Sequence, residues 1–181
     1  HLADLETHLM PDATPYFFTD DGSIPNNPTL PMLVYPAAVD TSASSESAVL
    51  FEQLFAQNGW TGGSWRNGIY PFPHYHSTAH EVLGIARGHA DVRFGGQTGA
   101  ILTVKSGDIT LLPAGCGHQK LGASPDLLVV GAYPPGPDWD LCRGGSSERR
   151  QATANIARVP LPRTDPVGGA TGPVIQYWLQ R

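Results

Sequence analysis

The chain has 181 residues and a formal net charge of −5, which argues against a basic face for the phosphates of a nucleic acid. This length favours one domain built around a single core. The 17 prolines and 21 glycines favour short strands joined by turns over long helices.

Residues 1–45 contain two apolar pieces, "PYFF" and "PMLVYPAAV", among many turn-forming residues. Their aromatic and branched side chains argue against disorder. We expect an N-terminal arm over residues 1–45 that packs on the domain and contributes one or two strands. His1 stands where a Met would start a natural chain, and we interpret it as a tag remnant.

A helix is predicted within "SSESAVLFEQLFAQNGW". Ser44 or Ser45 can cap its start, and Gly59 can end it. Four apolar residues at helical spacing form its packing stripe. They are Ala48, Phe51, Leu54 and Phe55.

From residue 60 to residue 134 the pattern changes to short apolar runs separated by glycine, proline or Ser/Asp turns. Seven or eight strands at this spacing predict a β-sandwich or barrel. The predicted strands are "GIYPFPHYH", "EVLGIARG", "HADVRFGG", "GAILTVKSG", "DITLLPAG", "GHQKLGA" and "DLLVVGAYP". We expect residues 46–146 to form the helix and barrel core. Residues 147–181 should extend the same domain with a short helix in "SSERRQATANIARV".

Two histidines lie one residue apart in the first of these runs. In an extended strand His74 and His76 share a face, with Cα atoms about 6.5–7 Å apart, so their rings can converge on one cation. The segment "STAH" is long enough for a hairpin turn, which can bring Glu81 back toward both rings.

A second polar element ends a later run, "GDITLLPAGCGH". Its Pro113-Ala114-Gly115 sequence predicts a tight turn that redirects the chain just before His118.

Together these two segments resemble the paired motifs of the cupin superfamily, G-x5-H-x-H-x4-E-x6-G and G-x5-P-x-G-x2-H-x3-N. The first matches at Gly68, His74, His76, Glu81 and Gly88, and the second at Gly107, Pro113, Gly115 and His118. Gly122 replaces the closing asparagine, which is a turn residue of the motif. The flanking "LLVVGAYPPGPDWDLCRG" and "TDPVGG" are similar to the YjlB-like branch of single-domain cupins.

The resemblance implies an all-β fold, the double-stranded β-helix or jelly-roll barrel, with the arm and one or two short helices outside it. It also implies that His74, His76, Glu81 and His118 bind one divalent transition metal inside the barrel. Three imidazoles and a carboxylate suit Fe, Mn, Ni, Co, Cu or Zn better than Mg or Ca. Such a set leaves coordination positions open for a substrate or water.

Strand alternation suggests what else lines the cavity. Tyr70 and Phe72 share the face of His74, Lys120 shares that of His118, and Leu83 and Ile85 share that of Glu81. We expect Tyr70 and Lys120 as catalytic or substrate-positioning groups, and Phe72, Leu83 and Ile85 as apolar substrate contacts. The alternatives without a functional role are that Tyr70 packs at the rim of the barrel and that Lys120 extends its ammonium group into solvent.

The remaining histidines and cysteines receive structural interpretations. We expect His80 at the surface or in a turn, His89 in solvent, and His8 in the arm without a partner. Cys116 can face the barrel but is interpreted as a packed thiol, as is Cys142. Two cysteines make no disulfide framework for this length, which favours a reducing cytoplasm.

These observations predict a mononuclear metal-dependent enzyme, such as a dioxygenase, for a small oxygenated organic molecule. The alternatives are a redox-neutral isomerase or lyase, and a non-catalytic metal- or ligand-binding protein. No apolar run is long enough to span a bilayer, so neither a membrane nor a nucleic acid is an expected partner. By analogy with other cupins we expect a homodimer, in which "PMLVYPAAV" adds a strand to the neighbour's sheet.

Overall fold

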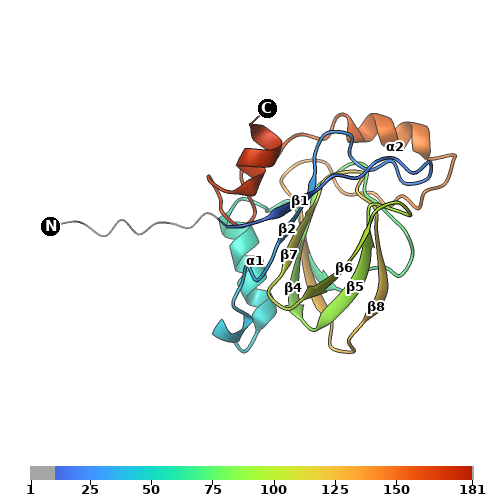
Figure 1. Cartoon of the computed structure of the whole chain (residues 1–181). Coiled ribbons are helices and arrows are strands. Elements are labelled where there is room, and N and C mark those ends of the chain that lie inside the picture. Colours follow the sequence, from blue (N-terminus) through green and yellow to red (C-terminus); the bar gives the residue numbers. More distant parts are fainter. Residues whose placement is uncertain (1–10, 181) are drawn as a thin grey trace.

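The computed structural model describes residues 11–180, which form two facing antiparallel sheets (Figure 1). The larger sheet has six strands, in the spatial order β1 (Thr14–Tyr16), β2 (Met32–Tyr35), β7 (Ile109–Leu112), β4 (Glu81–Arg87), β9 (Leu128–Ala132) and β3 (Ser64–Asn67). The smaller sheet has the order β6 (Ala100–Lys105), β5 (His89–Phe94) and β8 (His118–Ala123). This arrangement confirms the predicted jelly-roll barrel.

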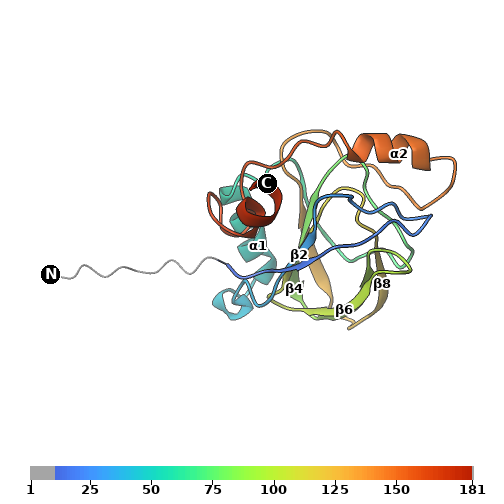
Figure 2. The same cartoon turned by 45° about the horizontal axis from the view of Figure 1, so that its top comes forward.

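Helices cover the outside of this barrel. They are η1 (Thr41–Ala43), α1 (Ser47–Gln57), α2 (Arg149–Ile156) and the π-helical turn η2 (Ile175–Leu179). Both views show α1 and the C-terminal helix side by side against the larger sheet, with α2 well apart from them (Figures 1 and 2). Phe51 and Phe55 of α1 and Trp178 of η2 are fully buried in this outer layer.

Strand β4 shows how alternation creates two separate cores. Leu83 and Ile85 point between the sheets, whereas Val82 packs outward beneath α1. Gly84 shares the outward face, where a Cβ atom would lie 2.2 Å from the ring of Phe51. The glycine therefore lets the helix approach the sheet closely.

The predicted helix is present, but it begins at a different residue. The N-cap position is Glu46, without a side-chain capping bond, whereas Ser44 or Ser45 was expected. The hydroxyl of Ser44 instead accepts the backbone N–H of Glu46, in the bend before the helix. The helix is therefore held mainly by packing of its apolar stripe.

Six of the predicted strands are confirmed as β4 to β9, but the run over residues 68–76 is not a regular strand. It contains a bend at residues 71–72 and forms only isolated bridges, at His74 and Tyr75. Strand β3 was not predicted, because "SWRN" has a single apolar residue and three polar ones. It pairs with β9 and forms an edge of the larger sheet.

The N-terminal segment places its strands inside this chain's own sheet. Strand β2 pairs with β1 on one side and β7 on the other. Within this single chain both edges of β2 are therefore occupied, and the expected homodimer stays a prediction. His1 and His8 lie outside the described residues.

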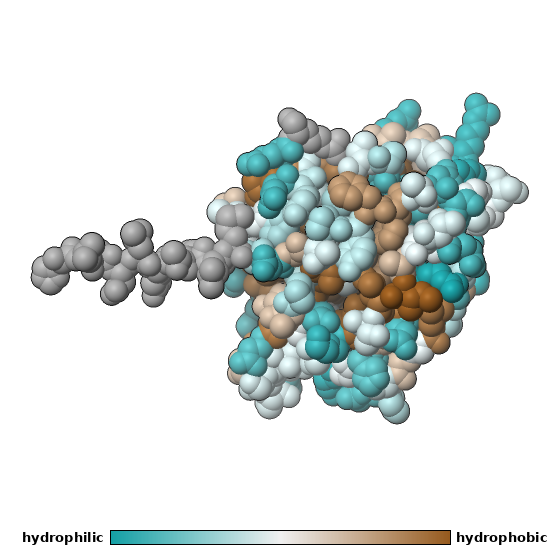
Figure 3. Space-filling model, in the orientation of Figure 1, coloured by the Kyte–Doolittle hydropathy of each residue, from teal (hydrophilic) through white to brown (hydrophobic). Residues whose placement is uncertain are grey.

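The molecular surface is mixed in character. Figure 3 shows hydrophilic and intermediate residues over most of one face, with a hydrophobic group over the smaller sheet, where Ile101 of β6 is 57% exposed. Within residues 11–180, no helix is long and apolar enough to cross a membrane.

Candidate metal centre

The extended segment before β4 brings the two sequence motifs together. The backbone N–H of His74 donates to the carbonyl of His118 at 3.1 Å, and the N–H of His118 donates back to His74 at 2.9 Å. This bridge places their imidazole centroids 3.9 Å apart. Residues that are distant in sequence thus form one cluster at the inner surface of the barrel.

Three histidines and one carboxylate share this buried cluster. His74, His76 and His118 each offer a nitrogen, and these atoms lie within 4.8 Å of one another, so the group can hold one metal ion. The Oε1 atom of Glu81 lies 3.4 Å from the Nε2 atoms of both His76 and His118. Two donors about 2.1 Å from one ion at tetrahedral angles are separated by about 3.4 Å, so these spacings fit a shared ion.

The orientation of the rings also fits a metal. Each Nδ1 atom faces a backbone carbonyl, so a neutral ring that donates from Nδ1 leaves its lone pair on Nε2. The three carbonyl partners belong to Phe72 for His74 (2.9 Å), Asp140 for His76, and Cys116 for His118 (3.1 Å). Such outer contacts fix a ligand's tautomer and direction.

Glu81 is held from the side opposite the histidines. The hydroxyl of Tyr133 donates to Glu81 Oε2 at 2.5 Å and accepts the indole N–H of Trp65 at 3.1 Å. Oε2 is therefore engaged, while Oε1 is directed to the histidines. The sequence interpretation missed Tyr133, although strand alternation could have found it, because Tyr133 continues the inward face of Val129 and Gly131 in β9.

Asp140 supports His76 in a second way. Its carboxylate accepts the backbone N–H and the hydroxyl of Ser77 and also the N–H of Thr78. The loop that carries the carbonyl partner of His76 is thereby tied to the turn that follows His76. Asp140 lies in a loop without periodicity, so no sequence signal indicated this role.

The electrostatics of the cluster favour an ionised carboxylate. Burial, reinforced by neighbouring His118, lowers the pKa of His74 to about 3, which keeps that ring neutral. Burial opposes ionisation of Glu81, yet His76 and His118 hold the Glu81 pKa well below its usual range. Burial also opposes protonation of His76, but the Glu81 carboxylate raises the His76 pKa. A cation at this place would substitute for that proton.

The cluster lies in the wall of a cavity of about 540 Å³. Tyr70 and Trp139 also line it and are each 46% exposed, so the cavity opens to solvent. Of the residues expected there, Tyr70, Leu83 and Lys120 contribute to the lining, whereas Phe72 and Ile85 are not among the described lining residues. The guanidinium of Arg143 lies over the ring of Phe72, 3.7 Å from its centroid. Ile85 lies deeper between the sheets.

The other histidines and the thiols lie outside the cluster. The expected surface position of His80 is wrong, since His80 is 1% exposed, accepts the backbone N–H of Ala114 at Nδ1, and packs against Trp178. His89 is exposed, as expected. Cys116 and Cys142 are buried free thiols. Burial raises the pKa of the Cys116 thiol far above its usual range.

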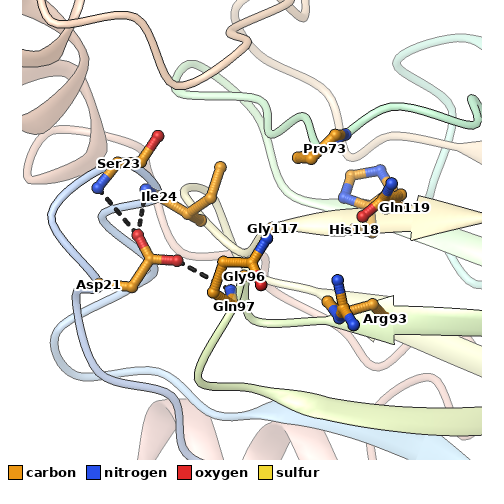
Figure 4. Close-up of a pocket in the computed structure, with 10 residues that line it drawn as sticks. All are labelled: Asp21, Ser23, Ile24, Pro73, Arg93, Gly96, Gln97, Gly117, His118 and Gln119. Carbon is orange, nitrogen blue, oxygen red and sulfur yellow. Dashed lines mark hydrogen bonds between the residues drawn. The ribbon is translucent and has the colours of Figure 1, made fainter.

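A second cavity, of about 70 Å³, lies on another side of His118 (Figure 4). Asp21 is one of its lining residues, and the Asp21 carboxylate accepts backbone N–H groups from Ser23, Ile24 and Gln97. These bonds occupy the carboxylate in closing a loop. The volume is also far below the roughly 300 Å³ of the smallest typical ligand pockets, so the larger cavity is the candidate site.

Comparison with known proteins identifies a close relative. No family model matches the chain. The chain is 42% identical over 165 residues to the uncharacterised protein YjlB of Bacillus subtilis (strain 168), which covers 91% of this chain and 96% of YjlB.

Several solved structures show a weaker likeness. Acireductone dioxygenase from Bacillus anthracis is 15% identical, with 57% of this chain and 70% of that chain covered and a TM-score of 0.38. The ketoisomerase WlaRA from Campylobacter jejuni is 13% identical, with 42% and 62% covered and a TM-score of 0.35. Pumpkin seed globulin is 20% identical, with 54% and 28% covered and a TM-score of 0.37. At this level of similarity, the activities of these three proteins give no information about the activity of this chain.

The relationship to YjlB extends over nearly the whole of both chains. The facing antiparallel sheets and the two histidine motifs brought together between them are the features of a cupin barrel. The chain therefore belongs to the YjlB family and has a cupin-type jelly-roll fold.

Proposed function

We propose that this protein is a mononuclear metal-dependent enzyme that acts on a small oxygenated organic molecule. The observation that carries the proposal is the position of the buried cluster, which lines a solvent-connected cavity of about 540 Å³. A purely structural metal site is closed by protein ligands, whereas a catalytic site keeps access for a substrate.

Residues His74, His76, Glu81 and His118 would hold the ion. When bound, such an ion supplies Lewis acidity toward a substrate oxygen or, if it is iron, a centre for oxygen chemistry. The donor set suits the divalent transition metals from manganese to zinc.

The chain's own groups would prepare the site for this chemistry. Tyr133 keeps one carboxylate oxygen of Glu81 engaged, so that the other is presented in a fixed direction. Trp139 stacks over Tyr133 with centroids 6.2 Å apart and an interplanar angle of 11°, and lies edge-on to His76. This aromatic lining would limit the number of water molecules beside a bound substrate.

A turnover assay tests the proposal. Protein loaded separately with Fe(II), Mn(II), Ni(II) or Zn(II) is incubated with a panel of small hydroxy and oxo compounds, in an oxygen electrode and under anaerobic conditions with NMR detection. We expect turnover with at least one metal, its loss in Glu81→Gln, and its retention in His89→Ala, the matched histidine control. Substrate-dependent oxygen uptake with both oxygen atoms incorporated into product would assign a dioxygenase, and anaerobic turnover with rearranged or cleaved product an isomerase or lyase.

One outcome would contradict an enzymatic role. If a small molecule copurifies tightly with the metal-loaded protein and is released unchanged under every condition, the protein is a binding protein. Mass spectrometry of the denatured protein's supernatant provides that measurement.

A further inference from the structure

Lys120 is the inward-facing cation of the candidate site. The chain has two lysines, and the other one, Lys105, is largely exposed and lies 3.6 Å from the carboxylate of Asp108. Lys120 follows His118 by two residues on β8, pairs with the inward Val92 of β5, and lines the large cavity. Its side chain is half-buried and makes no ion pair with any residue between 11 and 180.

The other charged groups around the cavity are either engaged or exposed. Arg66 binds Glu52 through two hydrogen bonds of 3.0 and 2.6 Å. Glu81 is surrounded by the histidines and Tyr133. Asp138 is exposed on the outer loop beside Trp139 and forms no ion pair within residues 11–180. Lys120 is therefore a half-buried cation without an anionic partner among residues 11–180.

A bound divalent ion would add to the excess positive charge of the cavity. The ion's charge of +2 and the −1 of Glu81 leave +1, to which Lys120 adds a further +1. Such a positive interior, lined by low-dielectric aromatic walls, favours an anionic occupant over a neutral one.

The rest of the cavity wall suits an apolar body. Trp65, Ile69, Leu83, Tyr133 and Trp139 all contribute to the lining. At the mouth Tyr70 stacks on Phe72, with centroids 4.9 Å apart and an interplanar angle of 16°. A volume of about 540 Å³ lies within the range of pockets that enclose small organic ligands.

From these features we propose that the cavity binds a small organic acid, with the substrate carboxylate paired to Lys120 and an apolar or aromatic body along the tryptophan and tyrosine wall. This inference rests on the proposed function, in that it names the substrate class for the same site. Lys120 is a specificity-determining residue in this scheme, since a neutral substrate would leave its charge half-buried and unpaired.

Calorimetric titration of the metal-loaded protein tests the proposal, with benzoate as the anionic probe and benzamide as its neutral match. We expect benzoate to bind measurably and benzamide at least about tenfold more weakly, a free-energy difference of about 1.4 kcal/mol. Lys120→Gln should remove this preference, whereas Lys105→Gln, the only other lysine change available, should preserve it. The metal content and melting temperature of each variant are measured in parallel.

Three results would overturn the proposal. The first is equal affinity of the wild type for benzoate and benzamide, and the second is unchanged benzoate affinity in Lys120→Gln. The third is that the wild type binds neither benzoate nor hexanoate, an aliphatic carboxylate used as a second anionic probe. A second readout uses lysine acylation with peptide mapping, in which benzoate should protect Lys120 and leave Lys105 reactive.

Failure of the metal site would be recognised separately. If no metal binds, the proposed function fails, but a preference for benzoate that depends on Lys120 would still be measured on the metal-free protein. If metal binds stoichiometrically and that preference is absent, only the substrate class is wrong.

Discussion

Replacement of Tyr133 by phenylalanine should weaken metal binding without removing any ligand. The change deletes the hydroxyl that donates to Glu81 Oε2 at 2.5 Å and accepts the indole N–H of Trp65 at 3.1 Å. Glu81 is 3% exposed, so water does not readily replace the lost donor. Loss of an outer contact of this kind costs about 10- to 100-fold in metal affinity, or about 1.4–2.7 kcal/mol.

The same substitution should also lower the stability of the metal-free protein. A buried carboxylate oxygen left without its partner costs about 1–3 kcal/mol. Affinity is measured by competition for Zn(II) with a chromophoric chelator, and the free energy of unfolding by urea titration. The matched control is Tyr16→Phe in β1, three strands away from β4 in the larger sheet.

The two readouts separate positioning from packing. Reduced affinity together with reduced stability is expected if Tyr133 orients Glu81. Reduced stability with unchanged Zn(II) affinity would show that the hydroxyl only fills space, and unchanged values of both would refute the reasoning.

Two further substitutions and one labelling experiment test other parts of the structure. Asp140→Asn should weaken Zn(II) binding and lower the melting temperature, because the carboxylate accepts from Ser77 and Thr78 and so fixes the carbonyl that faces His76; unchanged Zn(II) affinity would contradict this role. Gly84→Ala should cost about 1–3 kcal/mol in urea denaturation while metal content stays unchanged, because the new Cβ would lie 2.2 Å from Phe51; a neutral effect would mean that α1 can shift outward freely. The two thiols should react with a chromogenic disulfide only after denaturation, because burial raises the pKa of Cys142 to about 11 and that of Cys116 still further; fast labelling of the native protein at pH 8 would count against this packing.

Local spacing accounts for the parts of the site that could be predicted from the sequence. The separation of His74 from His76 and the turn before Glu81 constrain neighbouring positions of an extended chain. The strands were recognisable for the same reason, since glycine and proline turns mark the ends of short apolar runs. Strand β3 was not predicted because Trp65 is its only apolar residue, which is compatible with its position at the edge of the sheet.

Long-range packing explains the features that could not be predicted. His80 looks like a polar residue at the start of a strand, but the C-terminal helix brings Trp178 against its ring and buries it. Asp140 contacts the turn after His76 from a loop more than 60 residues away in the sequence. The periodicity of apolar residues in the sequence does not indicate such a contact. The ring of Phe72 contacts those of Tyr70 and His74, as alternation predicts, but residues 71–72 form a bend and the Arg143 guanidinium covers the ring, so Phe72 is not part of the lining.

The metal content of the protein tests the central claim most directly. Tag-free protein, purified without added metal and then loaded, is analysed by elemental mass spectrometry together with His118→Ala and His89→Ala. The account predicts close to one equivalent of a divalent transition metal in the wild type and in His89→Ala, and loss of that metal in His118→Ala. Absence of bound metal in the wild type under every loading condition, or full retention in folded His118→Ala, would contradict it.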